Sequence, residues 1–372
     1  MSSRNAAIGR NGRRPTSSTR SSASSWVAPS DPARRQAAMT SALLAGGSTG
    51  PIDFHTHLVP EAFPIDPEGT GPGWPCLACR PDGRRILEFG GKPFRRLDAR
   101  SWEAARRIED MERQGVSGQI VSPMPELFSY SFSPARSALL CDHVNHFTAS
   151  LVGMDPSRFG GLGIVTMQDV PTAVRQIGEI RSRFGLIGIE IGSNINGVYA
   201  GDPLFDPIYQ AAAEAGLIVF VHAFHPLSAG SGGLPAGLTP FLGFPIDVAH
   251  AAASCIARDL PTRFPGLKLL FSHGGGALGA ILGRMDRGYR VRAGGMEALT
   301  RAPSTVARDL FYDSNVYDPV YLRHLAADWG RGRTVLGTDY PYDIMQDDPM
   351  PYLIEAGLSS DSLAEATQAL LA

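Results

Sequence analysis

Eight short apolar runs alternate with longer stretches of helical pattern from residue 49 onward, and this alternation constrains the fold more than any other feature. Nearly continuous apolar runs suit parallel strands that are buried on both faces. Strand-like runs separated by helix-like stretches are typical of βα units. The runs are Ile52–Phe54, Val116–Val121, Gly161–Val165, Gly188–Ile191, Ile218–Val221, Leu267–Phe271, Leu310–Tyr312 and Thr334–Leu336.

Eight such units predict an α/β protein, a (β/α)8 TIM barrel that occupies residues 49–372. A length of about 320 residues fits one barrel with some insertions. The helical pattern is clearest in five segments between the runs, namely Trp102–Gln114, Pro134–Leu151, Pro171–Phe184, Asp206–Ala215 and Ile246–Arg263.

Two segments rich in glycine and proline interrupt this pattern, Pro60–Arg100 after the first run and Pro226–Pro245 after the fifth. Loops that follow barrel strands lie over the mouth where active sites form. We therefore expect both segments to be substrate loops. Residues 1–48 differ from the rest because serine, arginine, alanine and glycine dominate them. Such a composition does not bury a core, so we expect a disordered N-terminal extension.

Charge and cysteine content exclude several classes of protein. The formal charge is 34 − 36 = −2, which gives no electrostatic reason to expect nucleic acid or an anionic membrane as a partner. Inspection of the apolar runs finds none of the roughly 18–20 residues that cross a membrane. Four cysteines in 372 residues are no disulfide framework and favour a reducing cytoplasm.

Polar residues at the ends of the predicted strands are the main functional signal. The first strand runs into His55-Thr56-His57, the fifth ends at His222, the sixth at His273 and the eighth at Asp339. Residues i and i+2 of a strand point to the same face, and the carboxyl ends of barrel strands meet at one mouth. A single histidine at a strand end is more often a core residue, and Asp339 alone could cap a turn.

Their joint placement instead predicts one divalent ion held by His55, His57, His222 and Asp339. Imidazole and carboxylate ligands suit zinc, our expected ion, and also manganese. The fourth strand, Gly188–Gly192, offers no lysine that could bridge two ions, so we expect one ion. Glu190 is an alternative bridge.

These motifs resemble the decarboxylase branch of the amidohydrolase superfamily. The resemblance rests on His55-Thr56-His57, Val221-His222, Ser272–Gly276 and Leu336–Pro341, and it covers about residues 52 to 345. It implies that His273 is a general acid/base beside a metal-activated water, and that Asp339 is both ligand and catalytic residue. It also implies that Arg95 holds a substrate carboxylate and that the enzyme is a homodimer.

The fifth strand end departs from the family. The best-matching decarboxylase of this branch carries His-Pro-Trp-Asp there, whereas this chain has His222-Ala223-Phe224-His225. The following span, Ser228–Leu238, also lacks the arginine that the family gives to the neighbouring subunit's site. Phe224 and His225 are therefore candidate substrate contacts. The altered residues and the missing arginine predict a substrate that differs from that of the best-matching decarboxylase.

The resulting hypothesis is a metal-dependent decarboxylase, a carbon–carbon lyase, of a small conjugated or aromatic carboxylic acid. A metal-dependent hydrolase of an ester, lactone, amide or vinylogous carbon–carbon bond is the alternative, because the same residues would activate its water. A non-catalytic metal-binding protein is a third possibility, against which the acid/base position of His273 argues.

Overall fold

A computed structural model describes residues 43, 50–69, 73–227, 236–296 and 298–372. Eight strands form one sheet in the order β1-β5-β6-β7-β10-β11-β12-β13, and every neighbouring pair is parallel. The strands are β1 (Ile52–Leu58), β5 (Gly118–Pro123), β6 (Phe159–Gly163), β7 (Gly188–Gly192), β10 (Ile218–His222), β11 (Lys268–Phe271), β12 (Phe311–Asp313) and β13 (Thr334–Val335).

Parallel bridges from Asp53 to Leu336 and from Thr56 to Tyr340 join the first strand to the chain around the last. The sheet therefore closes into the predicted (β/α)8 barrel.

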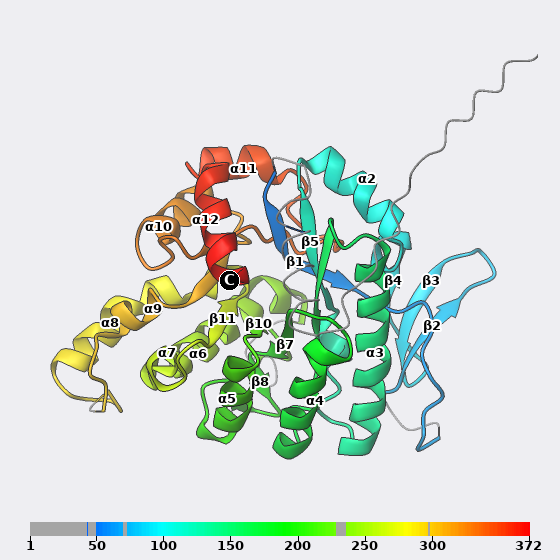
Figure 1. Cartoon of the computed structure of the whole chain (residues 1–372), viewed down its shortest axis with the longest axis horizontal. Helices are drawn as coiled ribbons and strands as arrows, with labels where there is room; N and C mark the ends of the chain where they lie inside the picture. The colour runs from blue at the N-terminus through cyan, green and yellow to red at the C-terminus, as the bar shows by residue number, and fades with distance from the viewer. Residues whose placement is uncertain (1–42, 44–49, 70–72, 228–235, 297) are drawn as a thin grey trace, which may run out of the picture.

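Helices cover the outer face of the barrel (Figure 1). Several begin where a side-chain oxygen accepts a backbone N–H of the first turn, as Asp169 does for α4 and Ser133 for α3. The helices are α2 (Ala104–Gln114), α3 (Pro134–Met154), α4 (Val170–Ser182), α5 (Asp206–Glu214), α6 (Phe244–Ala257), α7 (Leu260–Arg263), α8 (Leu278–Arg290), α9 (Pro303–Ala307), α10 (Pro319–Ala327), α11 (Pro349–Glu355) and α12 (Ser360–Leu371).

The barrel interior is a separate apolar cluster built from strand residues such as Phe54, Ile120 and Phe220. Leu370 of α12 and Leu43 join this cluster. Leu43 is helical and buried, and it is the one described residue among the first 48. The predicted disorder of that segment otherwise lies outside the described residues. Because apolar side chains fill the interior, polar side chains can gather only at the ends of the strands.

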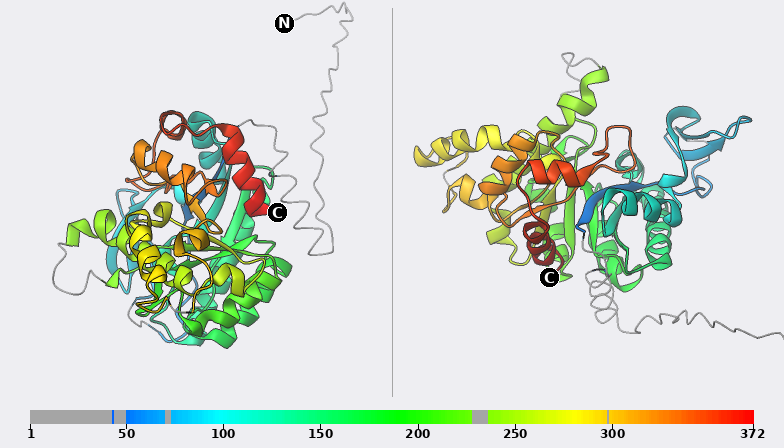
Figure 2. Two further views of the ribbon diagram at one scale, coloured as in Figure 1. Left: turned by 90° about the vertical axis from the view of Figure 1, so that its left-hand side faces the viewer. Right: turned by 90° about the horizontal axis from the view of Figure 1, so that it is seen from above.

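The first insertion contains an antiparallel sheet, where the sequence indicated only a loop. Its strands are β2 (Pro75–Cys79), β3 (Arg85–Phe89) and β4 (Lys92–Leu97). Gly90 and Gly91 both have positive φ between β3 and β4, which suits the tight turn of a hairpin. Figure 2 shows this sheet projecting from one side of the barrel.

The second insertion is described only in part, because residues 228–235 lie outside the described ranges. It continues through η5 (Ala236–Leu238) and a turn of π-helix, η6 (Thr239–Gly243), into α6. By length and mean hydropathy Thr239–Ala257 could cross a membrane, a segment that inspection of the apolar runs did not find. Seven residues of α6 are buried in the fold, and a core helix passes the same test, so the membrane evidence is weak.

Candidate metal centre

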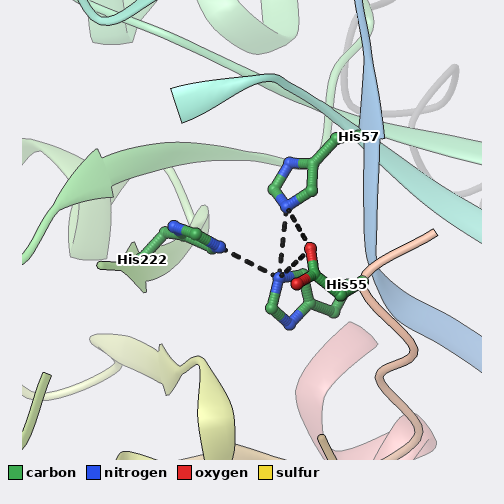
Figure 3. A group of neighbouring side chains, drawn as sticks. His55, His57 and His222 are labelled. Atoms are coloured by element: carbon green, nitrogen blue, oxygen red, sulfur yellow. Dashed lines mark hydrogen bonds and ion pairs between the residues drawn. The ribbon is translucent and has the colours of Figure 1, made fainter. Parts of the chain in front are cut away.

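Three histidines and one aspartate meet at the carboxyl ends of the barrel strands (Figure 3). His55 and His57 lie on β1, and His222 ends β10. The Nε2 atom of His55 lies 3.1 Å from that of His57 and 3.0 Å from that of His222. All four ligand atoms of the group, including an oxygen of Asp339, lie within 4.8 Å of one another.

The partners of the opposite ring nitrogens determine which nitrogen carries the proton. His55 Nδ1 lies 2.6 Å from a carboxylate oxygen of Asp313, and His222 Nδ1 lies 2.8 Å from the carbonyl oxygen of Ala223. His57 Nδ1 faces the carbonyl oxygen of Pro123 at 3.4 Å. Because these partners accept hydrogen bonds, they favour a proton on each Nδ1 and leave each Nε2 as the nitrogen that can bind an ion.

Asp339 completes the group with a buried carboxylate. Its Oδ1 lies 3.3 Å from His57 Nε2 and 3.5 Å from His55 Nε2, and it has no other hydrogen-bond partner among the described residues. Burial by itself raises the pKa of this carboxyl, but the charges of His55 and the contact with His57 lower it overall. Asp339 is therefore an anion that faces the Nε2 atoms of the histidines.

Such an arrangement fits a divalent cation. Buried lone pairs that face one another without a proton between them are unfavourable unless a cation lies among them. Three imidazoles and a carboxylate are suitable ligands for zinc or manganese. In the described part of the chain no other group of three or more such side chains has comparable geometry. The sequence prediction of the ligand set is thus consistent with the geometry.

Asp313, which the sequence analysis did not single out, supports both sides of this centre. One carboxylate oxygen contacts His55, and the other accepts the backbone N–H of Gly274 at 2.8 Å and of Asn315 at 3.1 Å. The side chain is completely buried. Asp313 ends β12 at the same mouth as the predicted ligands, and this position was the sequence feature that could have indicated its role.

His273 lies beside the predicted ligands. Its ring centroid is 5.3 Å from that of His55 and 5.2 Å from that of His222. Burial, followed by the charge of His55, lowers the pKa of His273 to about 4. The imidazole is therefore neutral at pH 7 and available to accept a proton.

The glycines after His273 allow close packing. His273, Gly274, Gly275 and Gly276 all have positive φ. A Cβ atom on Gly276 would lie 1.9 Å from the carbonyl oxygen of Pro245. Close packing against the Pro245 backbone therefore requires glycine at position 276.

A cavity of about 900 Å³ lies above the centre. Its wall includes His222, His273 and Asp339 together with the predicted substrate contacts Arg95, Phe224 and His225. The rest of the wall is largely aromatic and includes Phe94, Phe241, Phe244, Tyr317 and Tyr342. The geometry thus brings every predicted site residue except the fully buried His55 and His57 to one cavity, and those two lie directly beneath it.

Arg95 enters this cavity from β4 of the projecting sheet. Its Cζ atom lies 4.3 Å from the ring centroid of Tyr342, and the Tyr342 ring stacks on His57 at 5.2 Å. Glu126 also lines the cavity, and burial raises its pKa although Arg95 acts in the opposite direction. Neither was predicted, because Glu126 lies in the short 3-10 helix Pro125–Leu127 and Tyr342 in a loop, and neither segment has a distinctive motif.

Glu190, the alternative bridging residue, lies on β7 behind His57. Its Oε1 atom is 3.9 Å from His57 Nδ1, the nitrogen that points away from the ligand cluster. Burial raises the pKa of this carboxyl well above its usual range. Lys92 lies on β4 and Lys268 begins β11, so neither lysine ends β7. This geometry is compatible with a single ion.

A (β/α)8 barrel with a histidine–aspartate cluster at its mouth defines a class of metal-dependent barrel proteins. Within that class the family is clear, because the sequence profile of the family described as Amidohydrolase matches residues 52–367. The chain therefore belongs to the amidohydrolase family.

Two relatives share their named activity. The 2-amino-3-carboxymuconate-6-semialdehyde decarboxylase of Dictyostelium discoideum is 32% identical over 79% of this chain and 82% of its own. The enzyme of the same name from Caenorhabditis elegans is 30% identical over 79% and 86%. The family resemblance inferred from sequence motifs is thereby confirmed.

Solved structures agree in fold. The 5-carboxyvanillate decarboxylase of Sphingomonas paucimobilis is 26% identical, with a TM-score of 0.64 over 71% of this chain and 80% of that one. A dihydroxybenzoic acid decarboxylase of Polaromonas, solved with manganese and 2-nitroresorcinol, has a TM-score of 0.68 at 18% identity, over 87% and 96%. At that low identity the second likeness shows the fold alone.

Proposed function

We propose that this protein is a metal-dependent decarboxylase of a small aromatic or conjugated carboxylic acid. One observation carries the proposal: three imidazole lone pairs and the Asp339 carboxylate converge at the base of an aromatic-walled cavity that also holds Arg95 and His273. The named activities of the relatives support the same reaction class.

In this proposal Arg95 binds a substrate carboxylate through its planar guanidinium, and the stack on Tyr342 orients that group. Phe224 and His225 contact the ring or chain of the acid on the opposite wall. His273, neutral at pH 7, accepts a proton from a substrate hydroxyl or from water and delivers it to the carbon that bears the leaving carboxylate. The carbon–carbon bond then breaks, CO2 leaves, and the electron pair of that bond stays with the substrate carbon and restores the conjugated system.

The ligands His55, His57, His222 and Asp339 would hold the ion, and Asp339 would also take part in catalysis. When bound, a divalent ion polarises a substrate oxygen and lowers the pKa of a water ligand. We propose zinc as the resident ion, with manganese as the alternative that relatives' structures contain. A homodimer in the cytoplasm remains the expected state, and light scattering of the full chain checks the dimer.

The test begins with elemental analysis of the purified chain beside His222→Ala and Asp339→Ala, with His225→Ala as the control. We expect about one ion per chain in the wild type and in the control, and a large loss in both ligand variants. CO2 release is then measured with 5-carboxyvanillate, 2,6-dihydroxybenzoate, 6-methylsalicylate and 2-amino-3-carboxymuconate semialdehyde.

Release of CO2 by the metal-loaded wild type, but not by the metal-depleted variants, would establish the decarboxylase. Turnover of esters or lactones without CO2 release would instead support the hydrolase alternative. A protein that binds no metal would remove the basis of both.

A further inference from the structure

Asp247, on the first turn of α6, lies behind the cavity wall and is 2% exposed. Its Oδ2 atom accepts hydrogen bonds from the hydroxyl of Ser193 and from Asn194 Nδ2, the latter at 2.9 Å. Its Oδ1 atom accepts from the hydroxyl of Tyr199 and from the backbone N–H of Leu227, each at 3.2 Å. These four partners are neutral groups, so dipoles rather than a cation stabilise the carboxylate.

Ser193 and Asn194 also hold the turn Ala223–Leu227, which follows β10. The backbone N–H of Phe224 donates to Ser193 Oγ at 3.1 Å, and Asn194 Nδ2 also donates to the carbonyl oxygen of Phe224 at 2.8 Å. With the bond from Leu227, the turn is fixed at both of its ends. Asp247 thus connects α6 with the turn that carries Phe224 and His225, the two residues that depart from the family's sequence.

This turn has a conformation that local preference does not favour. His225 has a φ of 40°, a left-handed value that side chains other than glycine rarely adopt. Its ring stacks on Phe224, with centroids 4.0 Å apart and an interplanar angle of 11°. Strained backbone persists where surrounding contacts determine it, and here those contacts converge on Asp247.

We propose that Asp247 is a positioning residue that fixes the turn Ala223–Leu227 and thereby determines which acids the cavity accepts. Asp247 does not line the cavity, so it acts through Phe224 and His225. The effect on acid selection rests on the proposed function of the cavity. The anchoring of the turn does not, and it is tested separately.

Asp247→Asn is a sharp test because an amide has only one accepting oxygen. Its NH2 group must face either the N–H of Leu227 or the NH2 of Asn194. Neither donor can reverse its role, since one is backbone and the other also donates to a carbonyl. Hydrogen exchange of the Phe224 and Leu227 amides should become about tenfold faster, as expected when a hydrogen bond of ordinary strength is lost.

Asp361→Asn, on the exposed first turn of α12, is the matched control and should leave this exchange unchanged. Ser193→Ala is the second variant, and it removes the acceptor of the Phe224 amide even where Asp247→Asn does not fold. Metal content by elemental analysis should equal that of the wild type in both variants. KM for the acid that turns over should rise about tenfold, with a smaller change in kcat.

Unchanged exchange of both amides in Asp247→Asn and Ser193→Ala would overturn the proposal. Faster exchange throughout the barrel with loss of metal would also overturn it, because Asp247 would then support the whole fold rather than this turn. If no acid turns over in the wild type, the proposed function fails, and the exchange experiment still decides the anchoring. If the wild type turns over an acid, and both variants have its KM and its rates of amide hydrogen exchange, only the proposal that Asp247 anchors the turn fails.

Discussion

At the scale of single residues, Arg95 combines a flexible cation with a fixed aromatic support. The guanidinium lies over Tyr342, and Tyr342 stacks on the predicted ligand His57. Replacement by methionine keeps much of the apolar stem but removes the bidentate contact to a carboxylate. We expect Arg95→Met to raise KM by about tenfold to a hundredfold, because a charged hydrogen bond contributes about 1.5–3 kcal/mol.

Arg96→Met is the natural control, since Arg96 is the next residue of β4 and is exposed. Steady-state kinetics of the two variants with the same acid distinguish a local effect from a general one. Equal KM values for Arg95→Met and the wild type would remove Arg95 from substrate binding.

Asp313 is the second residue whose role can be tested alone. Its carboxylate contacts His55 and also accepts two backbone N–H groups. In Asp313→Asn an NH2 group must face either a backbone donor or the protonated His55 Nδ1. Because such supporting carboxylates orient metal-binding imidazoles, we expect metal affinity to fall about 10–100-fold.

Metal titration with a competing chelator measures that affinity. Asp343→Asn, exposed and four residues beyond Asp339, should bind metal as the wild type does. A wild-type affinity in Asp313→Asn would show that His55 needs no carboxylate partner.

The predicted ligands could be found from sequence because each of them lies within a few residues of the end of an apolar run. Asp313 also ends a strand, but it follows a polar-flanked run of three residues and lacked a histidine beside it. Glu126 and Tyr342 reach the cavity from a short 3-10 helix and from a loop, where no periodicity indicates the direction of a side chain. The supporting residues therefore required the three-dimensional structure.

At the scale of elements, Gly276 is the point where the turn after His273 packs against the first turn of α6. Its φ of 61° and ψ of −130° lie where residues other than glycine are strained, and an added Cβ would meet the Pro245 backbone. Gly276→Ala should lower the free energy of unfolding by at least about 1–3 kcal/mol. Chemical denaturation measures this loss.

Gly283→Ala provides the comparison within the neighbouring helix. A Cβ atom on Gly283 would meet nothing within 4 Å, and the residue lies inside α8. Alanine is favoured over glycine in helices, so this change should be neutral or stabilising by up to about 1 kcal/mol. Equal losses of stability in the two variants would contradict the packing argument.

The strands of the barrel were predictable because parallel strands buried on both faces consist almost wholly of apolar residues. The helix at Ile246–Arg263 instead divides into α6 and α7, where Asp259 adopts a left-handed conformation. The hairpin sheet was missed because Gly90 and Gly91 were interpreted as loop residues, although paired glycines also form tight hairpin turns. Short strands with half-buried faces give only weak periodicity.

At the scale of the whole molecule, metal binding should stabilise the barrel, since its ligands come from β1, β10 and the segment after β13. An ion that binds only the folded chain adds about 2.7 kcal/mol when its free concentration is 100 times Kd. We expect a chelator to lower Tm and added zinc or manganese to restore it. Asp339→Ala, studied in parallel by calorimetry, should respond weakly to either treatment.

An unchanged Tm after verified removal of the ion would mean that the folded and unfolded chains bind it equally. The same scan on Asp361→Asn shows whether a remote carboxamide changes the response.

The barrel closes where its first strand meets the chain around its last, and three of the four predicted metal ligands lie beside that seam. His55 and His57 precede the seam on one side, and Asp339 follows a last strand of only two residues on the other. A nascent chain still on the ribosome therefore exposes its first two ligands long before the fourth has been synthesised. The complete set exists only after closure, so we expect the ion to bind the closed barrel and not the growing chain.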